Sequence, residues 1–317
     1  MIDNEAFRPA PWLPGPHLQT IVPSLWAGPP VDGPVEHLTA RVADRSAVRL
    51  DINRPRGSAG ATLLLVHGMC GDSESAYMRR TARAALRRGW VAVRMNLRNC
   101  GGTESLSDTL YNAGQAEDVG RVLEALVCEG FPRPLFAAGF SLGGNLVLLN
   151  AGREGESCAA DRVAAVNPPI DLEVCASAIE LPGNSIYRAY YVFRLCRQLR
   201  RVAAVRGFPG PLPLARRVRT VRGFDELYTA PDGGYASAEE YYARSSAAPT
   251  LAGVRRPALV VSARDDPFVP VAIFAPHHGN GRLRFAHPRA GGHCGYWQAG
   301  SPRSWAAQAI LEFFETS

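Results

Sequence analysis

Short apolar runs alternate with amphipathic stretches along most of the chain. Few polar positions interrupt the apolar runs, which is typical of strands buried on both faces of a sheet. The runs are ATLLLVHG, WVAVRMN, PLFAAGF, RVAAVN, PALVVSA and GRLRFAH, which begin at residues 61, 90, 134, 162, 257 and 281. Helical periodicity occurs at residues 77–88, 115–128, 142–150 and 304–314. Strands that alternate with helices in this way predict βαβ units with right-handed crossovers and a mainly parallel sheet.

The alternation is interrupted at residues 168–249, where no run of this kind occurs. We interpret this segment as a helical cap, or lid, inserted into an α/β core. The core then consists of residues 1–167 and 250–317, and its first part begins with a Pro-rich arm at residues 1–35. The predicted fold class is therefore α/β, with a mainly parallel central sheet flanked by helices and covered by a helical insertion.

The pentapeptide Gly139-Phe140-Ser141-Leu142-Gly143 lies where a predicted strand passes into a predicted helix. A serine on so tight a turn has a strained backbone, and small residues two positions to either side let the turn close. The hydroxyl is then exposed above the sheet, where it can act as a nucleophile. A packing turn of small residues is the alternative, but the strand–turn–helix context favours Ser141 as a nucleophile.

A serine hydroxyl is a poor nucleophile unless a base removes its proton, and a carboxylate must orient that base. The chain order in folds that carry such a turn is serine, acid, histidine, so His277, His278, His287 and His293 are the candidate bases. His293 fits best because it lies in a Gly-rich loop after the last predicted strand, from which it can reach over the sheet edge. The other three lie at the ends of predicted elements, where a structural or surface role is expected.

The acid is expected after the strand that precedes this histidine, where Asp265 and Asp266 are adjacent in RDDPFVP. Neighbouring side chains point in different directions, so only one of the two can orient the imidazole. The other is expected to cap a helix or to pair with Arg264. Asp171, which follows the fourth apolar run, is a more distant candidate.

Backbone N–H groups must stabilise the oxyanion that develops during acyl transfer. One is expected from Leu142, the residue after the nucleophile. The other is expected from the main chain of Met69, in the loop HGMCG after the first apolar run. His67, at the start of this loop, is expected to brace the loop by hydrogen bonding rather than to act as a base.

A series of motifs resembles, in the same order, the YheT-like branch of the α/β-hydrolase superfamily: PWLPGPHLQT, LLLVHGMCGDSESAYMRR, MNLRNCGGTES, LYNAGQAEDV, GFSLGGN, VNPPIDL, EEYYARSSA, DDPFVP and GGHCGYW. They span residues 11–297, with one difference at Asn99, where the family pattern has a glycine. The resemblance implies an α/β-hydrolase fold and a serine hydrolase with the triad Ser141, Asp266 and His293, and its acid turn favours Asp266 over the neighbouring aspartate. It also implies carboxylic-ester substrates, since the branch includes esterases, lipases and medium-chain ester-forming acyltransferases.

The composition, with 46% hydrophobic and 20% charged residues, is that of a globular protein. All 35 basic residues are arginines, which indicates genomic composition bias, and no nucleic-acid-binding motif accompanies them, so no nucleic-acid partner is expected. The seven cysteines are widely spaced without a CxxC pair, which predicts reduced thiols and no metal site. The N-terminus lacks the basic and apolar regions of a secretory signal, and a cytoplasmic protein is therefore expected.

Positive charge is concentrated in the predicted cap. Residues 181–224 contain ten arginines and no acidic residue, whereas the whole chain has a net charge of only +6. Leu195 and Leu199 fall on one face of a predicted helix while Arg194 and Arg201 fall on the opposite face. Contact with an anionic membrane surface is one interpretation. Packing of the apolar face over an active-site cleft, with the arginines solvated or paired, is the favoured one.

These observations together predict a carboxylesterase that needs neither metal nor cofactor and cleaves esters of short to medium acyl chains. An acyltransferase, in which an alcohol replaces water as the acceptor, is the alternative within the same chemistry. A catalytically silent binding module on the same fold is the alternative from another class. The sequence makes no prediction about the oligomeric state.

Overall fold

The computed structural model describes residues 7–26, 28–207, 217–299 and 304–316. Part of the Pro-rich arm (residues 1–6 and 27) and part of the arginine-rich stretch (residues 208–216) lie outside the described residues, as do residues 300–303 and 317.

Eight strands within the described residues form one sheet in the order β1-β2-β4-β3-β5-β6-β7-β8. The two pairings of β2 are antiparallel and the other pairings are parallel, which confirms the predicted mainly parallel sheet. The strands are β1 (Glu36–Ala43), β2 (Ser46–Asn53), β3 (Ala61–Val66), β4 (Trp90–Met95), β5 (Leu135–Phe140), β6 (Arg162–Val166), β7 (Ala258–Val261) and β8 (Leu283–Ala286). Strands β3 to β8 overlap the six apolar runs that the sequence pattern predicts.

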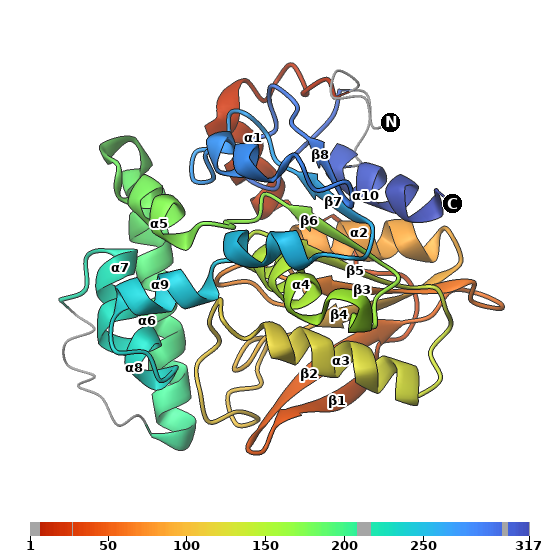
Figure 1. The fold of residues 1–317 in the computed structure, drawn as a ribbon, viewed down its shortest axis with the longest axis horizontal. Helices are drawn as coiled ribbons and strands as arrows, with labels where there is room; N and C mark the ends of the chain where they lie inside the picture. Colours follow the sequence, from red (N-terminus) through yellow and green to blue (C-terminus); the bar gives the residue numbers. More distant parts are fainter. Residues whose placement is uncertain (1–6, 27, 208–216, 300–303, 317) are drawn as a thin grey trace.

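Helices cover both faces of this sheet (Figure 1). On one face lie α2 (Ala76–Leu86) and α10 (Trp305–Glu315), and on the other lie α3 (Ala116–Cys128) and α4 (Leu142–Glu154). Successive side chains of β3 alternate between the two cores, so Leu63 packs with α2 and Leu64 with α3 and α4. This arrangement explains why the central strands are apolar at every position.

The segment between β6 and β7 is helical and lies at one end of the sheet, on the left of Figure 1. Its α-helices are α5 (Leu172–Glu180), α6 (Ser185–Arg206), α7 (Val221–Phe224), α8 (Ala230–Asp232) and α9 (Ala238–Ser245). The buried side chains of α6 include Leu195 and Leu199, as its predicted amphipathic pattern requires. Among the described helices, none combines the length and the apolar composition that a membrane crossing needs.

Several arginines of this segment contact acidic groups close by. Arg222 pairs with Glu173 of α5, and the Arg206 guanidinium lies 3.7 Å from a carboxylate oxygen of Asp232. On α6 itself, the charge of Arg206 is partly offset by Asp232. Arg197, Arg200 and Arg201 of this helix are exposed to solvent. None of the seven cysteines, all within the described residues, forms a disulfide.

The register of the sheet brings the ends of four parallel strands together. Val66 of β3 pairs with Gly139 of β5, Phe140 of β5 pairs with Val166 of β6, and Val166 pairs with Val261 of β7. The chain therefore leaves β3, β5, β6 and β7 at one edge of the sheet. The loops at this edge contain most of the residues that the sequence singles out.

Candidate active site

Ser141 lies on a sharp turn between β5 and α4, with φ 51° and ψ −124°. Two glycines make this turn possible. A Cβ atom at Gly139 would lie 2.1 Å from the carbonyl oxygen of Gly143, and one at Gly143 would lie 2.3 Å from the carbonyl oxygen of Val66. No larger residue fits at either position without moving the backbone, so the glycines on both sides of Ser141 are a steric requirement of the turn.

Ser141, His293 and Asp266 form a chain of hydrogen bonds. The Oγ atom of Ser141 lies 2.9 Å from Nε2 of His293, and Nδ1 of the same imidazole lies 2.8 Å from Oδ2 of Asp266. Ser141 directly follows β5, whereas His293 and Asp266 lie in the loops after β8 and β7. The structure thus brings together the three side chains that the sequence selects, in the order nucleophile, base, acid.

The Asp266 carboxylate is held by its own loop and by the end of β6. Its Oδ1 atom accepts hydrogen bonds from the backbone N–H groups of Phe268 (2.8 Å) and Val269 (3.1 Å). Its Oδ2 atom accepts one from the side-chain amide of Asn167. The Asp266 side chain is fully buried, and these donors leave Oδ2 facing the imidazole.

The carboxylate also determines the proton affinity of His293. Burial by itself lowers the pKa of this imidazole, but the charge of Asp266 and its hydrogen bond outweigh burial and raise the pKa well above its ordinary value. Asp266 therefore stabilises the imidazolium form of His293 in its position next to Ser141. This is the form that His293 adopts when it has taken a proton from a neighbouring hydroxyl.

Two backbone N–H groups beside Ser141 have no acceptor within the described part of the chain, those of Met69 and Leu142. The neighbours of Met69 do have partners, since the Gly68 N–H donates to the Tyr77 hydroxyl (2.9 Å) and the Cys70 N–H to the Tyr111 hydroxyl (2.9 Å). Gly68 also packs tightly on the nucleophile turn, because a Cβ atom there would lie 3.0 Å from Cβ of Ser141. Two donors are thus available next to the serine hydroxyl.

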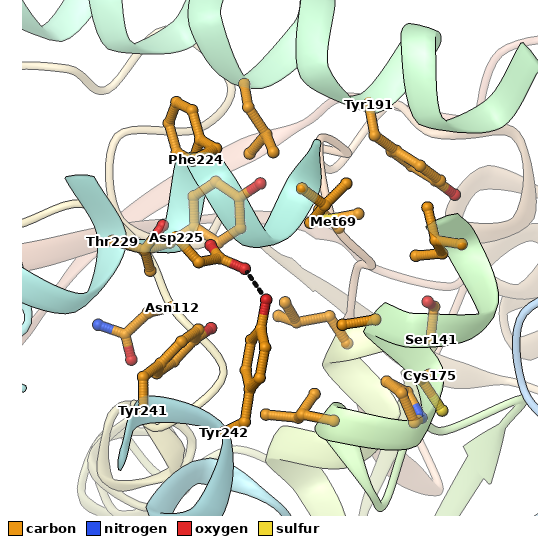
Figure 2. Close-up of a pocket in the computed structure, with 18 of the residues that line it drawn as sticks. Met69, Asn112, Ser141, Cys175, Tyr191, Phe224, Asp225, Thr229, Tyr241 and Tyr242 are labelled. Atoms are coloured by element: carbon orange, nitrogen blue, oxygen red, sulfur yellow. Dashed lines mark hydrogen bonds between the residues drawn. The ribbon is translucent and has the colours of Figure 1, made fainter. Parts of the chain in front are cut away.

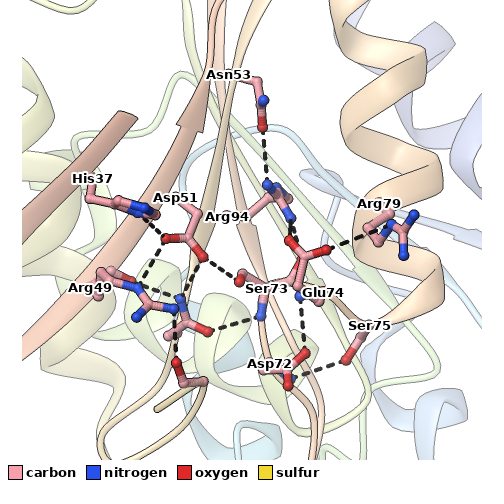
Figure 3. A network of polar contacts seen from close by, with 12 residues as sticks. His37, Arg49, Asp51, Asn53, Asp72, Ser73, Glu74, Ser75, Arg79 and Arg94 are labelled. Atoms are coloured by element: carbon pink, nitrogen blue, oxygen red, sulfur yellow. Dashed lines mark hydrogen bonds and ion pairs between the residues drawn. The ribbon is translucent and has the colours of Figure 1, made fainter. Parts of the chain in front are cut away.

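A buried polar network fixes the loop after β3 to the neighbouring strands (Figure 3). Asp51 of β2 accepts hydrogen bonds from the Ser73 hydroxyl and from Nδ2 of Asn96 (3.1 Å). The Ser73 N–H donates to Oδ1 of Asn96 (3.0 Å), and its carbonyl accepts from Arg94 (2.7 Å). The loop that contains Met69 is therefore fixed to the sheet through both the backbone and the side chain of Ser73.

Four of the other residues that the sequence singles out have structural partners. Asp265 accepts a hydrogen bond from the Gly292 N–H (2.9 Å), and Asp171 accepts one from Val174 at the start of α5. His67 accepts from the Leu97 N–H (3.1 Å), and its burial lowers its pKa to about 4, so it remains neutral and braces the loop as expected. His287 contacts the carbonyl of Ser262 (3.1 Å).

The histidine loop is also held from the N-terminal arm. Helix α1 (Gly15–Leu25) places Oγ1 of Thr20 where it accepts a hydrogen bond from the His293 N–H (2.8 Å). Gln19 exchanges hydrogen bonds with the backbone of Trp297, accepting from its N–H (3.0 Å) and donating to its carbonyl (3.3 Å). A Cβ atom at Gly295 would lie 1.6 Å from the Gln19 carbonyl oxygen, so arm and loop are in close contact.

Sequence reasoning missed Asn167, Thr20 and the network around Asp51. Asn167 could have been noticed, because it is a polar residue directly after a buried strand at the edge where the candidate residues gather. The contacts of Thr20 and Asp51 join segments far apart in the chain. Local pattern contains no signal for such pairings.

A pocket of about 90 Å³, partly open to solvent, adjoins Ser141 and lies between the sheet edge and helices α5, α6, α7 and α9 (Figure 2). Most of its lining is apolar and includes Leu142, Leu172, Leu195 and Leu199. The sulfur-containing side chains of Met69 and Cys175 also line it. An apolar pocket with a few polar groups is the usual form of a small-molecule site.

Comparisons with known proteins place the chain in a family and agree with its fold. Residues 61–299 match the model of a family described as having an alpha/beta hydrolase fold. The chain is 30% identical over 309 residues to the Escherichia coli (strain K12) protein YheT, whose name describes it as a candidate esterase, covering 95% of this chain and 90% of YheT. It is 29% identical over 279 residues to medium-chain fatty acid ethyl ester synthase/esterase 2 of Saccharomyces cerevisiae, covering 80% of this chain but only 61% of the yeast protein.

A solved structure shows the same fold. The superposition on an esterase from Pyrococcus furiosus covers 90% of this chain and 98% of the esterase chain, with a TM-score of 0.61 and 16% sequence identity. At this level of identity the likeness shows the fold alone and not the function.

Proposed function

Because the chain belongs to the α/β-hydrolase family, we propose that it is an esterase- or lipase-like serine hydrolase in which Ser141, His293 and Asp266 act as the catalytic triad. The single observation that carries this proposal is the continuous chain of hydrogen bonds from Ser141 through His293 to Asp266. The relatives named above as esterases are consistent with it.

In the proposed reaction, Oγ of Ser141 attacks the ester carbonyl carbon while Nε2 of His293 takes the hydroxyl proton. The carbonyl oxygen becomes an oxyanion, which accepts hydrogen bonds from the N–H groups of Met69 and Leu142. Collapse of the tetrahedral intermediate breaks the bond to the alcohol, and the imidazolium returns its proton to the leaving oxygen. Asp266 stabilises the imidazolium in both steps.

The acyl-enzyme is then hydrolysed by the same groups in reverse roles. His293 takes a proton from water, the hydroxide oxygen attacks the acyl carbon, and Oγ of Ser141 leaves with the proton from the imidazolium. The products are the carboxylic acid and the free enzyme. No step requires a metal or a redox cofactor.

The apolar lining of the pocket supports esters with a hydrophobic acyl chain of short to medium length as substrates. We propose that helices α5 to α9 act as a cap, with their apolar side chains lining the pocket and most of the α6 arginines facing away from it. Contact with a membrane surface is not needed for this arrangement. An acceptor alcohol in place of water would give ester synthesis, which the name of the yeast relative includes.

Hydrolysis of a p-nitrophenyl ester series from acetate to palmitate tests the proposal. The wild-type protein is expected to cleave part of the series, and Ser141→Ala is expected to lose on the order of 10⁶-fold in kcat. Ser177→Ala, which changes an exposed serine of α5, is the matched control and should retain wild-type rates. Equal rates for wild type and Ser141→Ala would refute the role of Ser141. The same assay with added ethanol, followed by product analysis, separates acyl transfer from hydrolysis.

A further inference from the structure

The pocket next to Ser141 is apolar along most of its lining but has one polar end. Figure 2 shows Asn112, Thr229, Asp225, Tyr241 and Tyr242 gathered on the side of the pocket away from Ser141. All five side chains belong to residues that are more than nine-tenths buried. The proposed reaction uses none of them, since the triad and the two oxyanion donors are elsewhere.

A buried carboxylate is costly in an apolar pocket unless hydrogen bonds or a ligand compensate its lost hydration. Asp225 accepts a hydrogen bond from the Tyr242 hydroxyl (2.6 Å) and one from the Thr229 side chain. Its two oxygens can accept about four hydrogen bonds in all, so acceptor capacity remains. The backbone here is a π-helical turn, Asp225–Thr229, a rare conformation that is frequent at functional sites.

Tyr241 supplies a donor at the same end of the pocket. Its hydroxyl oxygen accepts a hydrogen bond from the Ala113 N–H (2.8 Å), and its own O–H has no acceptor within the described residues. The ring packs against that of Tyr242, with ring centroids 5.3 Å apart. A free donor and an acceptor with spare capacity therefore lie at one end of an otherwise apolar pocket.

We propose that this polar end binds a hydroxyl group on the acyl chain of the substrate, so that the preferred substrates are esters of hydroxylated fatty acids. An alcohol hydroxyl can accept from Tyr241 and donate to Asp225 at the same time. A methyl terminus does neither, so it would leave the Tyr241 O–H without an acceptor and the remaining acceptor capacity of Asp225 unused, while an ammonium group only donates. The inference rests on the proposed esterase function and names the substrate class of the same site.

The charge state of Asp225 is consistent with an acceptor role. Burial raises its pKa to about 6, against the opposing hydrogen bonds from Tyr242 and Thr229 and the nearby charge of Arg222. The carboxyl group is therefore mainly ionised at pH 7.5 and accepts hydrogen bonds. A hydroxyl that donates to a buried carboxylate contributes more than one that donates to a neutral group.

Paired p-nitrophenyl esters test the inference. Straight-chain esters from butanoate to dodecanoate are compared with their ω-hydroxy counterparts, and the quantity measured is the ratio of kcat/KM within each pair. At the chain length that reaches the polar end, the hydroxylated ester should be preferred by at least about tenfold in the wild-type protein. This ratio does not depend on the fraction of enzyme that is folded, so a partly unstable variant still gives a valid result.

Two variants and one control complete the experiment. Asp225→Ala and Tyr241→Phe should each bring the ratio close to one, because the first removes the acceptor and the second removes the donor of the hydroxyl. Tyr235→Phe makes the same chemical change in a residue whose ring contacts Tyr241 at 5.2 Å but does not line the pocket, and it should keep the wild-type ratio.

The inference fails if the wild-type ratio is about one at every chain length, or if both variants keep the preference. It also fails if the ω-amino esters are preferred over the ω-hydroxy esters. Hydrolysis of the unsubstituted esters with a ratio of one would overturn this inference alone. Absence of hydrolysis for every ester would overturn the proposed function as well.

Discussion

At the scale of single residues, the candidate site depends on how tightly the carboxylate is fixed. Asp266 is fully buried and accepts backbone hydrogen bonds from Phe268 and Val269 on one oxygen. Its other oxygen faces both Asn167 and His293. With these contacts the carboxylate can neither rotate nor exchange its partners freely. The imidazole is thereby held with Nε2 toward Ser141, which is the orientation that proton transfer requires.

Asp266→Asn should change both the rate and its pH dependence. Only the neutral form of His293 can accept the serine proton, so activity falls as the pH drops through the pKa of this imidazole. Asp266 raises that pKa, and removal of its charge should therefore move the acidic limb of the kcat/KM profile to lower pH. The value of kcat should fall on the order of 10⁴-fold, because an amide also favours the wrong tautomer.

Asp265→Asn is the control for this prediction. Asp265 contacts the Gly292 N–H in the same loop but does not touch the imidazole nitrogens. The acidic limb of the kcat/KM profile should move less in Asp265→Asn than in Asp266→Asn. The kcat of Asp265→Asn should stay within about tenfold of the wild-type value. If Asp265→Asn caused the larger loss, the acid would have to be reassigned.

At the scale of elements, the parts that sequence pattern could predict are those that depend on local sequence. The apolar runs predict the buried strands, and Gly139 and Gly143 predict the turn because their backbone contacts exclude any Cβ atom. The candidates Ser141 and His293 follow from the turn motif and from the chain order of nucleophile, acid and base, whereas the choice of Asp266 over Asp265 rests on the resemblance to the family. The polar network around Asp51 could not be predicted, since β2 and the loop after β3 meet only through the strand order of the folded sheet.

That network gives a prediction about the loop that contains Met69. Ser73→Ala removes the hydroxyl that donates to Asp51, so the loop should become less well placed for the oxyanion. Loss of a complete oxyanion donor costs about 10²–10³-fold in kcat, and displacement of the loop should cost on the order of tenfold, with KM nearly unchanged. Steady-state kinetics on one p-nitrophenyl ester measure the split between kcat and KM.

Ser107→Ala provides the comparison for Ser73→Ala. The Ser107 hydroxyl is also buried and donates to the Ala47 carbonyl (2.8 Å), but it does not contact the loop after β3. It should lower thermal stability without a specific loss of kcat. An equal loss of kcat in both variants would mean that the network stabilises the fold and does not position the oxyanion donor.

At the scale of the whole molecule, distant segments of the chain complete the site. The N-terminal arm contacts the loop after β8 through Thr20 and Gln19, and helices α5, α6, α7 and α9 line the pocket opposite the sheet. A single residue in the arm can therefore affect the histidine. Neither contact follows from periodicity, because contacts between residues so far apart along the chain are set by the tertiary fold rather than by local sequence.

Thr20→Ala tests the contribution of the arm. It removes the acceptor of the His293 N–H, and a hydrogen bond of this kind contributes about 1 kcal/mol, which corresponds to about a fivefold loss in kcat/KM. The rate of fluorophosphonate labelling at Ser141 should fall by a similar factor. Ser24→Ala alters a hydroxyl on the same helix that donates a hydrogen bond to the Ile21 carbonyl (2.7 Å) and to no other group among the described residues. This variant should be labelled at the wild-type rate. Equal labelling rates for Thr20→Ala and the wild type would argue against a role of the arm in placing His293.

The buried charge of Asp225 should be visible in the stability of the whole protein. Its pKa is about 6 in the folded state and 3.8 in the reference state, so between these values the folded protein binds more protons than the unfolded chain. The contribution of Asp225 to the free energy of unfolding therefore decreases as the pH rises from about 4 to about 7. Each unit of difference in pKa between the folded and unfolded states corresponds to 1.36 kcal/mol. Asp225 should therefore lower the free energy of unfolding by about 3 kcal/mol over this pH range.

Asp225→Asn removes this titration. Urea unfolding at a series of pH values should show that the variant gains stability relative to the wild type as the pH rises through 4–7, whatever the offset caused by the altered hydrogen bond to Tyr242. Asp44→Asn makes the same change at an exposed position and should give a curve parallel to the wild type. A constant difference between Asp225→Asn and wild type would mean that Asp225 has the same pKa in both states. In that case the carboxylate would be hydrated in the folded protein and the polar end of the pocket would be open to water.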